Sequence, residues 1–238
     1  MLANPVAWFV SSLFLLPGVA IAVPTHELGH ALVAHWLGDR SPANRGYFRP
    51  DDVGKYFTVY GLLMFLFWRV GWGQRIPVNE ARLRGTGQQV NYSLGGPAAN
   101  LIGAVLFGFA FRFLHTGFLF DTTVQPLPLS YLAYILYGIY FANLAMLAFN
   151  LLPVPGFDGW IIVEALFRRR NPRFFMDVDF RRLQIQQYLL IGLFLSQLIP
   201  AVGGSLLPLA MTPFYEPPAL VILGQCSGYV GLVPCLLR

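Results

Sequence analysis

Two histidines four residues apart flank a glutamate near the N-terminus, in the segment His26-Glu27-Leu28-Gly29-His30. On an α-helix, residues four apart lie on one face, so His26 and His30 can direct both imidazoles at a single Zn²⁺. Glu27 is displaced around the helix, where its carboxylate can take a proton from a water molecule at the metal without being a ligand. The segment lies in a long apolar run, where ionisable side chains are costly and usually functional. A chance match within a helix bundle is the alternative.

Asp158 is the best candidate for the third protein ligand that a zinc site needs, because it is the only carboxylate between positions 122 and 163. It follows Pro153, Pro155 and Gly156, which should interrupt the helix and let the backbone present the Asp side chain at membrane depth. Irregular backbone is tolerated there only where it is buried or faces a cavity. Proline, glycine and aspartate are also ordinary turn residues, so a turn at the membrane surface is the alternative.

The composition indicates an integral membrane protein. Hydrophobic residues make up 56% of the 238 residues and charged residues 11%, whereas soluble domains have about 45–50% and about 25%. We expect one membrane domain over residues 1–238, with a core at 6–167 and C-terminal spans at 185–238, since no stretch outside the apolar runs is long enough for a separate soluble domain.

The apolar runs predict an all-α polytopic fold with about four to six transmembrane helices, three of them forming a catalytic core. Clear spans are expected at 6–36, 94–114, 131–152 with a continuation to 167, and 188–207. The run at 58–67 is too short to cross and suggests a re-entrant or interfacial segment, whereas 218–237 could be a span or a hairpin. A cleavable leader is the alternative for the first run, but no Lys or Arg precedes it.

The basic residues set the expected orientation. All of the 16 Lys and Arg residues except Arg112 and Arg238 lie in two segments, 40–84 and 168–182. The positive-inside rule makes these segments cytoplasmic and places His30 towards the inner end of its span. Topology signals and contacts with anionic lipids explain the basic clusters, so we expect the bilayer and no nucleic acid as a partner. The two cysteines are too few for a metal set.

Two ordered motifs resemble those of the site-2 protease family of intramembrane zinc metalloproteases. That family pairs an H-E-x-x-H helix with a later N-x-x-P-x-x-x-x-D-G stretch, and residues 26–30 and 150–159 match both at every specified position. Residues 96–100 are similar to the family's G-P-x-x-N element, and residues 71–79 look like a segment that small bacterial members carry. The resemblance covers about 6–164.

The resemblance implies one Zn²⁺ per chain and a role for each motif residue. The implied metal ligands are His26, His30 and Asp158, with Glu27 as the catalytic base. Asn100 and Asn150 are implied neighbours of the site that could donate to a substrate carbonyl or oxyanion. Amides in apolar spans often only bond neighbouring helices, so from chemistry alone either role is open to them.

The function implied is hydrolysis of peptide bonds in or near transmembrane segments of membrane protein substrates. The expected location is a bacterial inner or plasma membrane, with the catalytic site towards the cytoplasm. An extended surface from the loop 38–90 could pair with an unwound substrate. A non-catalytic scaffold that binds transmembrane helices is one alternative, although no ligand or glutamate is lost. A membrane metal-binding or transport protein is the other, but it would need polar residues along several spans. The sequence carries no signal for an oligomeric state.

Overall fold

The computed structural model describes residues 5–49, 53–68, 73–79, 82–116, 127–198 and 206–223. Within these ranges every regular element is a helix, and the one β-type contact is an isolated antiparallel bridge between Phe57 and Gly73. The elements are α1 (Pro5–Trp36), α2 (Ser41–Asn44), the 3₁₀ helix η1 (Val53–Tyr56), α3 (Val59–Trp68), α4 (Thr86–Thr116), α5 (Leu127–Asn150), α6 (Asp158–Phe167), α7 (Pro172–Phe180), α8 (Arg182–Leu198) and α10 (Leu206–Leu223). The expected all-α class is confirmed.

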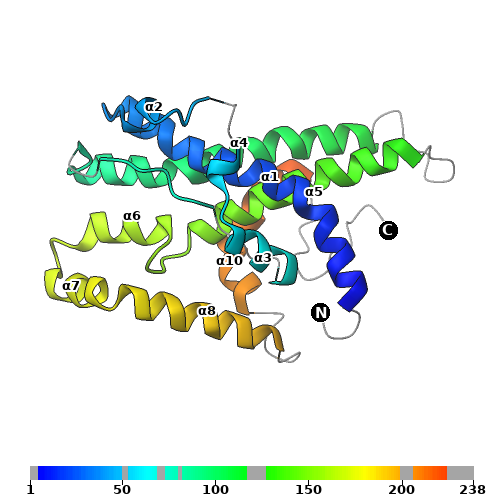
Figure 1. Cartoon of the computed structure of the whole chain (residues 1–238). Coiled ribbons are helices and arrows are strands. Elements are labelled where there is room, and N and C mark those ends of the chain that lie inside the picture. The colour runs from blue at the N-terminus through cyan, green and yellow to red at the C-terminus, as the bar shows by residue number, and fades with distance from the viewer. Residues whose placement is uncertain are drawn as a thin grey trace.

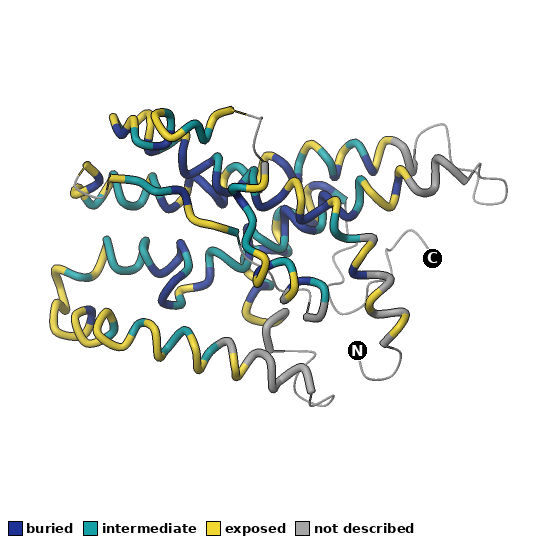
Figure 2. The backbone as a smooth tube through the Cα atoms, in the orientation of Figure 1, coloured by how far each residue is buried: buried dark blue, intermediate teal, exposed yellow. Residues whose placement is uncertain are grey.

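Helices α1, α4 and α5 pack against one another and form the centre of the fold (Figure 1). Glycines let their backbones approach closely, as is common where membrane helices cross. A Cβ added to Gly29 would overlap the Gly95 carbonyl and lie 2.6 Å from the Cβ of Ala99. Gly18 meets the backbone of Gly138 in the same way. Buried residues gather where the three helices meet, while α7 and the described part of α8 are mostly exposed (Figure 2).

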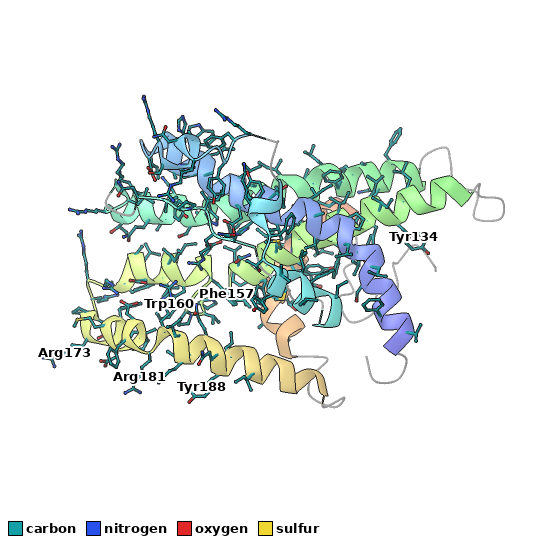
Figure 3. All side chains as sticks on the ribbon, in the orientation of Figure 1. Tyr134, Phe157, Trp160, Arg173, Arg181 and Tyr188 are labelled. Atoms are coloured by element: carbon teal, nitrogen blue, oxygen red, sulfur yellow. The ribbon has the colours of Figure 1, made fainter. Side chains whose placement is uncertain are left out.

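The later helices are added around this centre. Helix α10 packs on α5 and α4 through an apolar cluster that includes Tyr140, Leu144 and Ile222. Helix α6 packs on α4, and Trp160 joins it to α7 through a ring contact of 5.5 Å with Phe175. Figure 3 shows Phe157 and Trp160 between α6 and the α7–α8 layer, whereas the labelled Arg173, Arg181 and Tyr188 point away from the core. These last three side chains therefore take no part in the packing around α6.

Two described stretches, Thr86–Phe113 and Leu132–Asn150, are long and apolar enough to cross a bilayer. Helix α4 carries an outward stripe of apolar residues at helical spacing, and each is between 45% and 72% exposed. These residues are Ile102, Leu106, Phe109 and Phe113. Such a continuous apolar face fits contact with lipid. The ten residues of α3 extend only about 15 Å, too short for a straight crossing.

The structure changes two predicted boundaries. Helix α8 begins at Arg182, before the expected span 188–207, and residues 199–205 of that span lie outside the described residues. Helix α10 continues through Pro218, where a new segment was expected to begin. Prolines are tolerated in membrane helices. At the end of α10, Arg112 of α4 donates to the Ile222 carbonyl at 3.1 Å and so pairs one carbonyl of the last turn. The total number of spans stays a prediction.

Some predicted features lie outside the described residues. They are Gly71 and Trp72, residues 117–126 of the loop before α5, and the end of the 218–237 run with Cys226 and Cys235.

Candidate metal centre

Helices α1 and α6 bring three potential metal ligands together, although 128 positions separate the second from the third. The Nε2 atom of His30 lies 3.2 Å from Nε2 of His26. Oδ2 of Asp158 lies 3.1 Å from each of these nitrogens. All three residues are buried, with exposed fractions of 4%, 5% and 7% for His26, His30 and Asp158. The predicted ligands therefore share one enclosed position in the fold.

Helix α4 fixes which nitrogen of each imidazole faces this centre. The carboxamide of Asn100 donates through Nδ2 to the Ala22 carbonyl at 3.0 Å, so its Oδ1 is directed at Nδ1 of His26, 2.6 Å away. Nδ1 of His30 lies 2.8 Å from the Tyr92 carbonyl. Because both partners are acceptors, each Nδ1 carries a proton and donates it. The neutral rings then direct their Nε2 lone pairs at one another and at Asp158.

This donor set fits a tetrahedral zinc ion. Three lone pairs facing one another at 3.1–3.2 Å repel unless a cation lies between them. Ligands at the usual Zn–N and Zn–O distances of about 2.0–2.2 Å lie about 3.3 Å apart on a tetrahedron, close to the separations found. Gly96 of α4 leaves the necessary space, because a Cβ there would lie 2.7 Å from Nε2 of His26 and closer still to Nε2 of His30.

Glu27 lies beside the three donors but outside the ligand group. Its carboxylate is 7% exposed, and Oε2 accepts a hydrogen bond of 3.2 Å from the backbone amide of Ile76. This arrangement matches the expected position of a base next to a metal, displaced around α1 from the two histidines. It also shows that a non-helical segment outside α1 holds the carboxylate in place.

That segment, residues 73–79, is attached at several points. The Gln74 amide donates to the Tyr56 carbonyl at 2.8 Å, and the Arg75 guanidinium donates to the Gly156 carbonyl. At its far end, the Asn79 amide donates to Oδ2 of Asp39 at 2.7 Å. Gly73 is required for this course, because a Cβ there would lie 2.5 Å from a methyl group of Val23 in α1.

Asp39 connects the end of α1 to this segment and is only 1% exposed. Besides the Asn79 amide, its carboxylate accepts bonds from the backbone amide and the hydroxyl of Ser41, at 2.9 and 2.6 Å. Burial alone raises the pKa of the Asp39 carboxyl, but these donors and the nearby Arg82 cation outweigh it and hold the pKa below its ordinary range. Asp39 is therefore an ionised anchor for the segment.

The irregular stretch between α5 and α6 sets the position of Asp158. Gly156 has φ of +106°, a conformation that a side chain would disfavour. Gly159 lies against the backbone directly after α5, where a Cβ would be 2.5 Å from the Leu151 carbonyl carbon. Asp158 then begins α6 and faces the histidines of α1. The helix is interrupted between α5 and α6, as the prolines and glycines predict. This interruption places the Asp158 carboxylate in a buried position.

A cavity of about 640 Å³ opens beside these groups. His26, Glu27, His30 and Asp158 line one part of it, and Phe149 and Gln186 line others. Asn150 also borders the cavity, and its Nδ2 donates to the Met146 carbonyl at 3.0 Å. The three potential ligands and Glu27 therefore face a space large enough for a bound molecule.

Comparison of the sequence with known proteins places the chain in a family. No family model and no solved structure matches the chain. The chain is 30% identical over 165 residues to "Putative zinc metalloprotease YwhC" of Bacillus subtilis (strain 168), covering 64% of this chain and 68% of that protein. The chain belongs to the site-2 protease family. It is also similar to Rip2 of Mycobacterium tuberculosis (strain ATCC 25618 / H37Rv), which bears the same description, at 29% identity over 84% of this chain and 73% of that protein.

For this site-2 protease family member, sequence reasoning found the groups that face the cavity and missed those behind them. The structure brings His26, His30, Glu27 and Asp158 together and places Asn150 at the cavity. Backbone partners such as the Ile76 amide cannot be recognised from the sequence, because almost every residue type has the same main-chain N–H group. Asn143 was also missed, although it is an amide in an apolar span, the same signal that marked Asn100 and Asn150.

Proposed function

We propose that the protein is a zinc-dependent intramembrane protease that hydrolyses peptide bonds in or near transmembrane segments of membrane proteins. The observation that carries this proposal is the convergence of two imidazoles and one carboxylate within 3.1–3.2 Å, with Glu27 beside them in a cavity. The apolar helices and the relatives described as zinc metalloproteases support it.

In the proposed mechanism, His26, His30 and Asp158 would hold Zn²⁺, which when bound would polarise the scissile carbonyl and acidify a water molecule. Glu27 takes the proton from the attacking water and passes it to the leaving nitrogen, while the Ile76 amide keeps its carboxylate oriented. Asn150 borders the cavity and is suited to donate to the developing oxyanion. The amide of Asn100 already donates to Ala22 and Asn143, so its contacts favour orientation of His26 instead.

The substrate must present extended backbone to these groups, because a helix keeps its backbone hydrogen bonds internal. Residues 73–79 contain no helix, and Gly73 and Arg75 line the cavity. We propose that this segment, in the loop first identified from sequence as 38–90, pairs with the unwound stretch of the substrate through main-chain hydrogen bonds.

Removal of the metal tests the proposed function. The purified protein should contain one zinc per chain by elemental analysis, and stripping it with a chelator should abolish cleavage of a reporter transmembrane substrate until zinc is restored. A variant with both His26→Ala and His30→Ala should hold no zinc, whereas His35→Ala, on an exposed position of the same helix, should retain it. Unchanged zinc in the double variant would contradict the assignment, and a scaffold would bind the reporter without cutting it.

We also propose that the catalytic site lies towards the cytoplasmic face. His30 precedes the end of α1 at Trp36 by six positions, which is about 9 Å along the helix, and the first basic residue, Arg40, follows that end. In a variant without Cys226 and Cys235, a cysteine introduced at the exposed Asn44 should react with an impermeant thiol reagent only after the inner face is opened. A cysteine at Thr122 should react in intact cells. Labelling of the Asn44→Cys variant in intact cells would show the opposite orientation.

A further inference from the structure

We propose that Asn143 is a positioning residue for the metal ligand His26, acting through Asn100. This inference rests on the proposed metal centre and concerns how one ligand is prepared to bind. Asn143 lies in α5, is 0% exposed and contacts no group of the cavity lining in any hydrogen bond. Its effect on the metal must therefore pass through another side chain.

The orientation of the Asn143 carboxamide follows from the backbone of its own helix. Its Nδ2 donates to the Ile139 carbonyl at 2.8 Å. A carbonyl can only accept, so the NH₂ group must lie on that side. The Oδ1 atom of Asn143 is then directed at Asn100, and it accepts a hydrogen bond of 2.9 Å from Nδ2 of that residue.

Asn100 passes this orientation to His26. The NH₂ group of Asn100 has two protons, one donated to the Ala22 carbonyl at 3.0 Å and the other to Asn143. Rotating the amide by half a turn would place its oxygen against both of these acceptors. Oδ1 of Asn100 therefore faces Nδ1 of His26, at 2.6 Å, and accepts its proton. His26 is held as the tautomer whose Nε2 lone pair faces Asp158.

Close packing keeps Asn143 in this position. A Cβ added to Gly103 of α4 would lie 2.5 Å from Oδ1 and 2.9 Å from Cγ of Asn143. The carboxamide thus lies directly against the α4 backbone, one turn from Asn100. The hydrogen-bonded series joins the three central helices, since His26 belongs to α1, Asn100 to α4 and Asn143 to α5.

Buried amides in membrane proteins often only hold helices together. Such a purely structural role for Asn143 predicts a different result from a positioning role. Simple attachment predicts that loss of Asn143 lowers stability and leaves the imidazole unchanged. Positioning predicts a change in the protonated nitrogen of His26 and in zinc affinity. The imidazole tautomer in the metal-free protein separates the two roles.

The test uses the full chain in detergent with ¹⁵N-labelled histidine, and the His26 signals are assigned by their loss in His26→Gln. In the metal-free wild type, Nδ1 of His26 should carry a proton, because it faces Oδ1 of Asn100. Asn143→Leu should give a mixture of tautomers and weaken zinc binding by about 10- to 100-fold in competition with a chelator. Asn143→Asp keeps an oxygen facing Asn100 and should restore most of the affinity.

Tyr140→Phe is the matched control. Tyr140 lies on α5 three residues before Asn143, and its buried hydroxyl has no hydrogen-bond partner among the described residues. It should match the wild type in both measurements. If Asn143→Leu does not fold, Gly103→Ala displaces the Asn143 carboxamide without removing a polar group and should give the same mixture. The proposal would be overturned if Gly103→Ala or Asn143→Leu showed a single tautomer protonated at Nδ1 together with wild-type zinc affinity. Failure of the wild type to bind zinc would instead overturn the metal centre.

Discussion

Replacing Glu27 by glutamine should reduce cleavage of a reporter transmembrane substrate by at least about 100-fold, because general acid–base groups typically contribute 10² to 10⁴ in rate. Zinc content should stay at the wild-type value. The amide has the size of the carboxylate, lies outside the ligand group and can still accept the Ile76 hydrogen bond through its oxygen. Single-turnover cleavage in detergent, with elemental analysis of the same preparation, measures both quantities.

A glutamate outside the cavity lining supplies the control for this substitution. Glu164 lies on α6 and pairs with Arg168 at 2.8 Å, and Glu164→Gln should cleave at nearly the wild-type rate. Substantial turnover by the zinc-loaded Glu27→Gln variant would show that another group activates the water. Loss of zinc from this variant would show that Glu27 contributes to metal binding itself.

Gly96→Ala should prevent normal zinc binding through a single added methyl group. The new Cβ would lie 2.6 Å from Cε1 and 2.7 Å from Nε2 of His26, and nearer still to His30, so the imidazoles must separate. Since a displacement of about 1 Å in a catalytic group can cost about 100-fold in rate, cleavage should fall by at least that factor. Zinc per chain, measured by elemental analysis, should fall well below one.

Gly87→Ala is the matched control for this change, because Gly87 lies on the same helix and, apart from its own helical backbone, no atom of the described residues lies within 4 Å of an added Cβ. Alanine is also the better helix former, so any general effect of removing a helical glycine should be stabilising. Full zinc content in Gly96→Ala would mean that the ligands meet in a different arrangement from the one described.

The sequence predicts the ligands of this site better than the groups that orient them. His26 and His30 are marked by their spacing and Asp158 by the broken helix before it, and all three depend on local patterns. The contact between Asn100 and His26 depends instead on how α1 and α4 cross, which local spacing does not specify. The Tyr92 carbonyl is a main-chain group, so its role depends on the fold and on no particular side chain.

In the fold, too, local sequence patterns predict some features and packing between helices determines others. The all-α class follows from composition and from the long apolar runs. The boundaries near Pro218 do not, because a proline inside an apolar segment does not always end a helix, and here α10 continues through Pro218 while packed on α5 and α4.

The ionised state of Asp39 determines what a pH–rate profile of this protein would report. A carboxyl whose pKa is lower in the folded protein contributes stability that is fully present above its unfolded pKa and is lost as the pH falls through the folded value. For aspartate the unfolded value is about 3.9, and the pKa of Asp39 lies below its ordinary range. The attachment of residues 73–79 to Asp39 therefore persists through neutral and mildly acidic solution. Activity changes between about pH 5 and 8 would then not arise from protonation of Asp39 and release of this segment.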